Sequence, residues 1–445
     1  MTASEVLAGF VAAFQPDDVA PALLAKVKDH LLDTIGVACA GSTDPQARAV
    51  ASVVQRWGGH PEAGVIGFGL RLPAPKAAFL NALHARIHTF DDTHEAGPSH
   101  PGSAVVAAAL AAAETAQASG RTLLVALLAG YETATRVSAA LGPGHYGAGF
   151  HSTGTATPFG AAAAASRAGG LDAARTAAAL GLAGEAAIGL RQYQDDGSML
   201  DTALNGARGA ELGVAAAAFA AAGMAGPRGV LDGRWGVLKV MNGGPAASLT
   251  ADLGQRWEFA DTKVKPFASC RFTHGPIAAL RAANLDPQRI AAVEIVTFRA
   301  SVEVSDRPRP RDRMEAILSH QLAAALALLG RPIVPCELEA PDATVCALAE
   351  RVRVRHDPAL DAAYPACWPH RISVSMHDGG RVMLESLHPP AADSTGIRAK
   401  FRTLAVPVFG TANADAVIGI ISDLERIPDV QPLLRLLRYG LAEAA

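Results

Sequence analysis

The pattern of hydrophobic residues changes near residue 265 of the chain. Before this point, apolar residues recur at the spacing of one helix face, and alanine and glycine fill many of the other positions. Small residues let helices approach closely, and alanine has the highest helix propensity. A stack of tightly packed helices is therefore predicted. The predicted helices cover residues 19–40, 75–87, 103–118, 123–141, 160–168, 173–190 and 207–222.

After residue 265 the pattern becomes short, alternating and rich in β-branched residues, which is typical of strands. The predicted strands cover residues 290–299, 352–356, 371–376 and 381–384. An Asp-Gly pair lies between the last two runs, at residues 378–379, and favours a hairpin. Residues 319–330 predict a helix. This part of the chain is therefore expected to be a small α+β domain.

The helical pattern returns near the C-terminus, over residues 392–404, 414–424 and 430–441. We expect these helices to pack on the first ones, which makes the helical domain discontinuous. The predicted fold is a large all-helical domain with a smaller α+β lid domain. Residues 1–265 are assigned to the first part of the helical domain, 266–392 to the lid, and 393–445 to the returning helices.

Composition narrows the class of protein. Half of the 445 residues are hydrophobic and 18% are charged, and the mean hydropathy is +0.20, which fits a soluble protein with a large core and a buried subunit interface. A net charge of −3 without a basic cluster argues against a nucleic-acid partner. No membrane span or signal peptide is predicted. The five cysteines show neither a disulfide framework nor zinc-ligand spacing, so we expect a cytoplasmic protein.

The densest group of titratable residues lies between residues 90 and 100. It contains two adjacent carboxylates, a hydroxyl and two histidines: Asp91, Asp92, Thr93, His94 and His100. A polar loop that opens a buried helix can hold acid–base groups rigidly. The alternative is that the first three residues form a turn and a helix cap. The two histidines lie in a loop without a recognised metal-ligand spacing, so no metal is predicted.

A glycine-rich segment, residues 142–154, contains five glycines before a predicted helix. Such a loop can present backbone N–H groups to an anion such as a carboxylate, close to a helix N-terminus. A simple connection between helices is the alternative, but the glycine content favours the anion site. Tyr146 and His151 are its candidate side chains.

Residues 263–274 bring several cationic side chains to the predicted domain boundary, where substrate clefts usually form. Lys263, Lys265 and Arg271 would suit a carboxylate substrate, and a desolvated lysine can act as a base. His274 ends the segment. The alternative is a surface linker with ordinary solvated charges. No glycine motif for nucleotide binding and no serine-hydrolase motif is present.

Several motifs occur in a fixed order along the chain. They are residues 90–94 with His100-Pro101-Gly102, Gly130-Tyr131-Glu132 with Arg136, residues 149–155 and 160–163, Gly197-Ser198-Met199, Gly226-Pro227 with residues 231–233, and Lys265 to His274. In this order they resemble the MmgE/PrpD family, and the resemblance extends from residues 31–36 to Lys400-Phe401. It implies an all-helical domain with a smaller α+β lid, a homodimer, no metal and no organic cofactor.

The resemblance also implies an enzyme that acts on small di- or tricarboxylates: a 2-methylcitrate dehydratase, a cis-aconitate decarboxylase or an iminodisuccinate epimerase. Four positions depart from the family pattern. Where the family usually has aspartate, lysine, histidine and tyrosine, this chain has Thr89, Thr202, Asn205 and a position near Leu322. A dehydratase must protonate a departing hydroxyl, which is harder without these groups. An epimerase needs only one group on each face of the α-carbon.

We therefore expect a cofactor-independent epimerase that removes and returns the α-proton of a small amino or imino di- or polycarboxylate, similar to iminodisuccinate. The predicted two-base pair is Tyr146 with Lys265, and Lys263 is a near alternative. The predicted substrate-binding residues are Asp91, Asp92, Thr93, His94, His100, His151, Arg271 and His274. The alternatives are a hydro-lyase that dehydrates 2-methylcitrate or a related tricarboxylate, and a non-catalytic carboxylate-binding paralogue.

Overall fold

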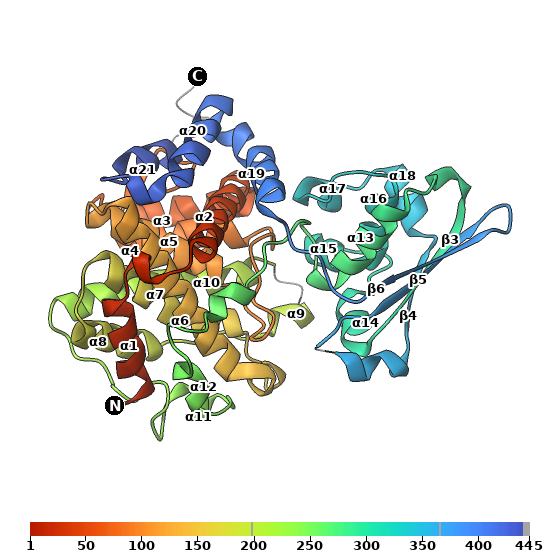
Figure 1. The fold of residues 1–445 in the computed structure, drawn as a ribbon. Helices are drawn as coiled ribbons and strands as arrows, with labels where there is room; N and C mark the ends of the chain where they lie inside the picture. The colour runs from red at the N-terminus through yellow and green to blue at the C-terminus, as the bar shows by residue number, and fades with distance from the viewer. Residues whose placement is uncertain (197–198, 365, 439–445) are drawn as a thin grey trace. The chain divides into compact units, whose positions relative to one another are not determined.

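The computed structural model describes residues 1–196, 199–364 and 366–438. The chain forms two compact units, each described by itself (Figure 1). The first contains Met1–Asp196, Leu200–Val264 and the C-terminal part from Asp393, and the second contains Lys265–Ala392. The first unit is almost entirely helical and the second combines helices with a sheet. The predicted fold class is thus confirmed.

The helical unit is built from long helices joined by short connections. Its main helices are α1 (Ala3–Ala13), α2 (Pro21–Ser42), α3 (Pro45–Trp57), α4 (Ala74–Arg86), α5 (Pro101–Thr115), α6 (Gly120–Gly147), α7 (Ser152–Ala168), α8 (Ala173–Gly184), α10 (Met199–Ala221), α19 (Ser394–Phe409), α20 (Thr411–Ser422) and α21 (Gln431–Arg438). The shorter elements are α9 (Tyr193–Asp196), α11 (Val237–Val240), α12 (Ala247–Thr250), β1 (Ala63–Gly64) and β2 (Arg71–Leu72). None of the described helices is long and apolar enough to cross a membrane.

Helices α5, α6 and α7 pack against one another and form the centre of this unit. Nearly every residue of α5 and α7 is buried, which explains why alanine dominates both helices. The backbones of α6 and α7 lie close together at Gly130 and Gly160. A Cβ atom on Gly130 would lie 2.9 Å from the Gly160 carbonyl oxygen, so a larger residue would force the two helices apart.

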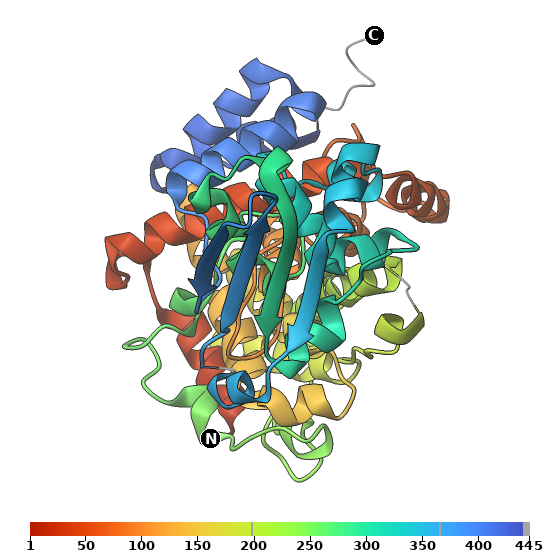
Figure 2. The same cartoon turned by 90° about the vertical axis from the view of Figure 1, so that its right-hand side faces the viewer.

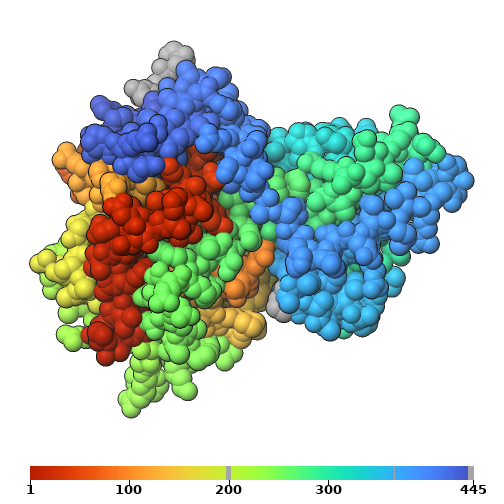
Figure 3. Space-filling model, in the orientation of Figure 1, coloured from red at the N-terminus to blue at the C-terminus, as the bar shows by residue number. Residues whose placement is uncertain are grey.

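The C-terminal helices complete the helical unit. Helix α19 packs against α2, and Figure 3 shows the last segment in blue beside the red N-terminal helices. The ammonium group of Lys400 in α19 is buried 2.7 Å from the Asp33 carboxylate of α2. It also donates a hydrogen bond of 2.8 Å to the Phe90 carbonyl oxygen. This buried ion pair ties the C-terminal part of the chain to the loop that follows α4.

Two predicted helix boundaries are wrong for the same reason. Helix α8 ends at Gly184 rather than near residue 190, and α7 begins at Ser152 rather than near residue 160. The segment before α7 pairs with the segment after α8: the N–H of His151 donates to Gly189 O and the N–H of Arg191 donates to Gly149 O, both at 3.0 Å. Tertiary pairing thus overrides the helical periodicity of residues 185–190.

Among the described helices of ten or more residues, three are absent from the sequence prediction: α1, α3 and α13 (His274–Ala283). Helix α3 carried a readable signal, because Asp44 caps the N–H groups of Gln46 and Ala47, and Pro45 occupies the first turn. Helix α6 is longer than predicted and contains a break at Gly142, whose φ of +62° is followed by Pro143.

The α+β unit contains one four-stranded sheet, drawn face-on in Figure 2, in the order β4-β3-β5-β6. Its strands are β3 (Ile290–Thr297), β4 (Val352–His356), β5 (His370–Met376) and β6 (Arg381–Ser386). Strand β3 is parallel to β4, and the other pairs are antiparallel. The predicted hairpin joins β5 to β6, and Gly379 in its turn has a φ of +87°.

Six helices accompany this sheet. They are α13, α14 (Arg299–Ser305), α15 (Arg313–Leu318), α16 (His320–Leu328), α17 (Pro335–Glu339) and α18 (Ala343–Ala349). Helices α13 and α16 pack against each other and contact sheet strands. Strands β3 and β5 bury alternating apolar side chains, such as Val293 and Ile295 opposite Val374 and Ile372. These paired side chains form the core of the sheet.

Candidate active site

The loop after α4 contains a buried ion pair. Arg86, the last residue of α4, donates from Nη1 to Asp91 Oδ1 at 2.9 Å, and both side chains are almost fully buried. The Nε atom of Arg86 is buried and has no hydrogen-bond partner among the described residues. A buried guanidinium that keeps a donor in reserve is suited to bind a carboxylate. The sequence analysis did not single out Arg86.

Asp92 has a different position from Asp91, because its carboxylate points into the core. Its Oδ1 atom accepts from the N–H of Gly102 at 2.9 Å. Its Oδ2 atom accepts from the hydroxyl of Tyr131 at 2.9 Å and from His30 Nδ1 at 2.8 Å. These contacts hold both carboxylate oxygens of Asp92 within the helical unit, and its predicted contact with substrate stays a prediction.

Thr93 and His94 are also held by the protein itself. Thr93 and Lys263 exchange two backbone hydrogen bonds of 2.8 Å, so these two segments run side by side. The Nε2 atom of His94 lies 3.2 Å from Glu258 Oε1. Hydrogen bonding to His94, together with the nearby Arg256 charge, holds the pKa of the Glu258 carboxyl below its usual value. The contact between His94 and Glu258 joins the loop to the segment before Lys263.

His100 is oriented by the backbone of the same loop. Its Nδ1 atom lies 2.7 Å from the carbonyl oxygen of Asp92. A carbonyl can only accept, so Nδ1 carries the proton and the lone pair of the neutral ring is on Nε2. The Asp91 carboxylate lies 3.6 Å from the same Nδ1 atom. This carboxylate would stabilise the imidazolium that forms when Nε2 accepts a proton.

The hydrogen-bond polarity of the His151 ring is opposite to that of the His100 ring. It caps α7, and its Nδ1 atom accepts the N–H of Thr153 at 3.2 Å, so the ring proton is on Nε2. Burial, with the positive charges of Arg86 and Arg191 nearby, lowers the pKa of His151 to about 3. The ring is therefore neutral at ordinary pH and can donate from Nε2. Its centroid lies 6.3 Å from that of His100, and the two rings are nearly parallel.

Tyr146 and Tyr193 lie beside His151. Their ring centroids are 6.3 Å and 5.8 Å from the His151 ring. The guanidinium of Arg191 lies 3.7 Å from the centre of the Tyr146 ring and donates to its carbonyl oxygen at 2.8 Å. Gln194 reaches the Tyr146 hydroxyl at 3.4 Å. Neither Tyr193 nor Arg191 was singled out from the sequence, because the chain before them was predicted as the end of a helix.

Several backbone N–H groups of the glycine-rich loop donate within the protein itself. The N–H groups of Ala148 and Gly149 donate to carbonyls of the preceding turn. The N–H groups of Thr153 and Gly154 donate to the ring and the carbonyl of His151. The anion site at this loop stays a prediction, and side chains around His151 add further donors for a carboxylate. Arg86, Arg191 and His151 are the donors available for it.

Three of the predicted residues, Lys265, Arg271 and His274, belong to the α+β unit. Lys265 is buried and belongs to this unit, whereas Lys263 is half-buried and belongs to the helical unit. Arg271 donates to the carbonyl oxygens of Pro389 and Pro390. It also lies 3.2 Å from His274 Nδ1.

The other ring nitrogen of His274, Nε2, lies 3.3 Å from Ser269 O. Both ring nitrogens of His274 are thus engaged within the unit. His274 therefore orients Arg271, and Arg271 holds the segment after β6. Within the described residues, no group of three or more histidine, cysteine or acidic side chains is arranged to hold a metal.

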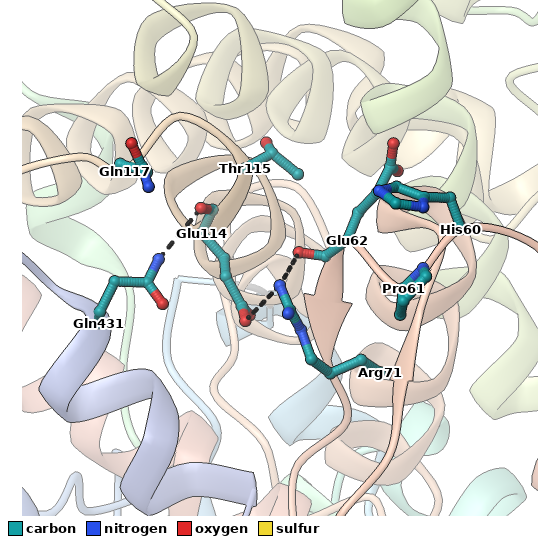
Figure 4. Close-up of a pocket in the computed structure, with 8 residues that line it drawn as sticks. All are labelled: His60, Pro61, Glu62, Arg71, Glu114, Thr115, Gln117 and Gln431. Carbon is teal, nitrogen blue, oxygen red and sulfur yellow. Dashed lines mark hydrogen bonds and ion pairs between the residues drawn. The ribbon is translucent and has the colours of Figure 1, made fainter.

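The helical unit contains a pocket with a volume of about 560 Å³, which is shown in Figure 4. Its polar groups bind mainly to each other. Arg71 donates to Glu62 O at 2.8 Å and lies 3.4 Å from Glu114 Oε1, and Gln431 donates to Glu114 O at 3.1 Å. None of the catalytic candidates lines this pocket. We therefore place the candidate active site around His100 and His151, a group of residues called the histidine cluster.

Comparison with known protein families agrees with the order of motifs in the chain. The MmgE/PrpD N-terminal domain matches residues 5–250, and the MmgE/PrpD C-terminal domain matches residues 267–426. The chain belongs to the MmgE/PrpD family. Members of this family are enzymes that act on small carboxylates. The Gly197-Ser198 part of one family motif lies outside the described residues.

Relatives with assigned names match this MmgE/PrpD protein over nearly its whole length. A cis-aconitate decarboxylase-like protein, oryM, from Aspergillus oryzae is 29% identical over 97% of this chain and 96% of its own. The cis-aconitate decarboxylase of Aspergillus terreus is 26% identical over 95% of this chain and 93% of its own. The human cis-aconitate decarboxylase is 26% identical over 94% of this chain and 90% of its own.

Proposed function

We propose that this protein catalyses proton transfer at the carbon next to a carboxylate of a small amino or imino di- or polycarboxylate, and that it acts as an epimerase. The observation that carries the proposal is the opposite polarity of two neighbouring histidines. His100 has its lone pair on Nε2 and its Nδ1 atom near the Asp91 carboxylate, and His151 is a neutral Nε2–H donor. A proton acceptor next to a hydrogen-bond donor is what α-proton removal requires.

In the proposed reaction, His100 Nε2 takes the α-proton and the C–H electron pair moves into the adjacent carboxylate or imine. Arg86, Arg191 and His151 stabilise the negative charge that develops on the substrate. Tyr146 then gives its hydroxyl proton to the opposite face of the carbon. Solvent protonates the tyrosinate and removes the proton from His100, so the enzyme returns to its starting state.

The epimerase assignment is favoured by the groups that this chain lacks. Thr89, Thr202 and Asn205 stand where the resemblance expects aspartate, lysine and histidine. Thr202 is buried, and its hydroxyl has no hydrogen-bond partner among the described residues. A neutral hydroxyl is a weaker acid than an ammonium group for protonating a departing hydroxide. Removal and return of a proton needs no such acid.

The test is proton NMR of the purified protein in heavy water with iminodisuccinate, aspartate-derived imino acids, 2-methylcitrate, citrate and cis-aconitate. We expect an α-proton signal to disappear from an amino or imino dicarboxylate without a new vinyl signal. A vinyl signal from a citrate-type substrate would overturn the epimerase proposal. Binding of a dicarboxylate without any exchange would support the non-catalytic alternative.

The bases can be separated by the stereochemistry of exchange. In a two-base epimerase, loss of one base blocks exchange from one enantiomer and leaves exchange from the other. We expect His100→Asn and Tyr146→Phe to block opposite enantiomers. The resemblance instead pairs Tyr146 with Lys265, so Lys265→Met is tested in parallel. If Lys265→Met blocks one enantiomer while His100→Asn blocks neither, Lys265 is the base and His100 is not.

A second candidate is a lyase, because the relatives named above are cis-aconitate decarboxylases or resemble them. For a decarboxylase, the same NMR panel would show loss of cis-aconitate with release of carbon dioxide. His100, in its protonated form, could then supply the proton that replaces the lost carboxylate. The homodimer implied by the resemblance is likewise proposed here, and light scattering of the purified protein tests it.

A further inference from the structure

We propose that Asp92 is a positioning residue for His100, and that His30 and Tyr131 act on His100 through it. The effect on turnover rests on the proposed function. The proton position on the His100 ring, by contrast, can be measured without any substrate.

The Asp92 carboxylate is fixed from three directions. It is fully buried and takes one hydrogen bond each from α5 (Gly102 N–H), α6 (Tyr131 hydroxyl) and α2 (His30 Nδ1), at 2.8–2.9 Å. Three donors on two oxygens leave the side chain a single rotamer. A Cβ atom on Gly102 would lie within 2.8 Å of both Asp92 carboxylate oxygens, so the close approach requires glycine at this position.

The peptide group between Asp92 and Thr93 links the fixed Asp92 side chain to His100. Its N–H donates to Lys263 O at 2.8 Å, and its C=O accepts from His100 Nδ1 at 2.7 Å. The N–H and C=O of a trans peptide point in opposite directions, so a peptide fixed at one end presents its other end in a fixed direction. Hydrogen bonds at both ends also polarise the peptide and make its carbonyl a stronger acceptor.

His30 and Tyr131 contact Asp92 in the core. Their ring centroids lie 5.5 Å apart in an edge-on arrangement, and Phe259 packs against both rings. Burial, with the negative charge of Asp92, raises the pKa of Tyr131 well above its usual value, so its hydroxyl remains a donor. Both residues therefore help to hold the Asp92 backbone in place.

The consequence concerns the tautomer of His100. If the Asp92 carbonyl turns away, Nδ1–H loses its acceptor and the ring can carry its proton on either nitrogen. Molecules with the proton on Nε2 cannot accept a substrate proton there. Loss of a donor to the Asp92 carboxylate should therefore reduce the fraction of molecules whose His100 can accept a proton on Nε2. The groups that bind the carboxylates of the substrate should be little affected.

The experiment uses the full chain with 15N-labelled histidine and long-range proton–nitrogen NMR at about pH 8, where a histidine of ordinary pKa is neutral. The His100 signals are identified by their loss in His100→Asn. The test variants are Tyr131→Phe and His30→Leu. His30→Asn is the conservative variant, because its amide N–H can replace the Nδ1–H donor. Tyr364→Phe, in the α+β unit, is the matched control.

We expect one His100 tautomer in the wild type, with Nε2 unprotonated, and a mixture of tautomers in Tyr131→Phe and His30→Leu. The value of kcat should fall about tenfold in these variants, while KM stays within about twofold. His30→Asn should restore both readouts. An unchanged His100 tautomer in folded Tyr131→Phe and His30→Leu would overturn the positioning role. A changed tautomer with unchanged turnover would support positioning but remove His100 from the proposed mechanism.

Discussion

Each unit contains a cluster of arginine and histidine side chains, but the two clusters use these groups differently. In the helical unit, His100 and His151 are both fixed through Nδ1, by a carbonyl and by a backbone N–H respectively. Their Nε2 atoms therefore have opposite polarity. In the α+β unit, Arg271 and one ring nitrogen of His274 face each other, while the other ring nitrogen faces a carbonyl.

The comparison shows that a cluster of catalytic residue types is not by itself an active site. The Nδ1 contacts of His100 and His151 set the tautomer of each ring, whereas both ring nitrogens of His274 contact groups that hold the structure of the α+β unit. Arg86 and Arg271 differ in the same way. Arg86 keeps a buried Nε donor without a hydrogen-bond partner among the described residues. Arg271 instead donates to two carbonyls of the segment after β6.

The largest expected effect is at Arg86. Arg86→Met would remove the guanidinium that pairs with the buried Asp91 carboxylate, which should lower the free energy of unfolding by roughly 3–5 kcal/mol. Arg86→Lys keeps the charge and should lose less. Urea unfolding followed by circular dichroism measures both changes. Equal stability of Arg86→Met and wild type would mean that the ion pair is not an important part of this cluster.

Arg271→Met tests the other cluster. Loss of the hydrogen bonds to Pro389 and Pro390 should lower the free energy of unfolding by about 1.5–3 kcal/mol. If Arg271 is structural, KM for the carboxylate substrate should stay within about twofold of wild type in the folded variant. A large rise in KM with unchanged stability would contradict the structural role. Arg271 would then be the substrate ligand that the sequence predicts.

Gly102→Ala tests the close packing around Asp92. The added methyl group would lie 2.6 Å from the Tyr131 hydroxyl and should lower the free energy of unfolding by about 1–3 kcal/mol. Gly419→Ala in α20 is the matched control, because its Cβ would meet no atom within 4 Å. This control should stabilise the protein by up to about 1 kcal/mol. Thermal unfolding compares the two, and equal effects would contradict the packing argument.

The last expected effect appears only in acid. Burial lowers the pKa of His84 in α4 to about 3, against an ordinary value of 6.5. Between these values the unfolded chain binds a proton that the folded protein excludes, so stability falls as pH decreases from 6.5 towards 3. His84→Phe removes this group and should reduce the slope by at most about 1.4 kcal/mol per pH unit. Identical slopes in urea unfolding from pH 4 to 7 would contradict a neutral buried His84.

Some features could be predicted from the sequence because they depend on residues close together in the chain. The periodicity of apolar residues predicted most of the central helices, and Asp378-Gly379 predicted the β5–β6 hairpin. The ordered motifs predicted the family. The Asp44 cap of α3 was equally local and could have been read. Where residues 189–191 pair with residues 149–151, however, local periodicity gave the wrong helix boundary.

The chemistry of the candidate site was decided by tertiary structure. The sequence showed that His100 and His151 were candidates, but a proton position on imidazole depends on which atoms face each ring nitrogen. The atom that faces Nδ1 of His100 is the carbonyl oxygen of Asp92, and the group that faces Nδ1 of His151 is the N–H of Thr153 at the start of α7. Arg86 and Arg191 reach the cluster from α4 and from the chain before α9, and no sequence spacing marks them. Helical periodicity is a property of neighbouring residues, whereas polarity at a site depends on contacts between distant ones.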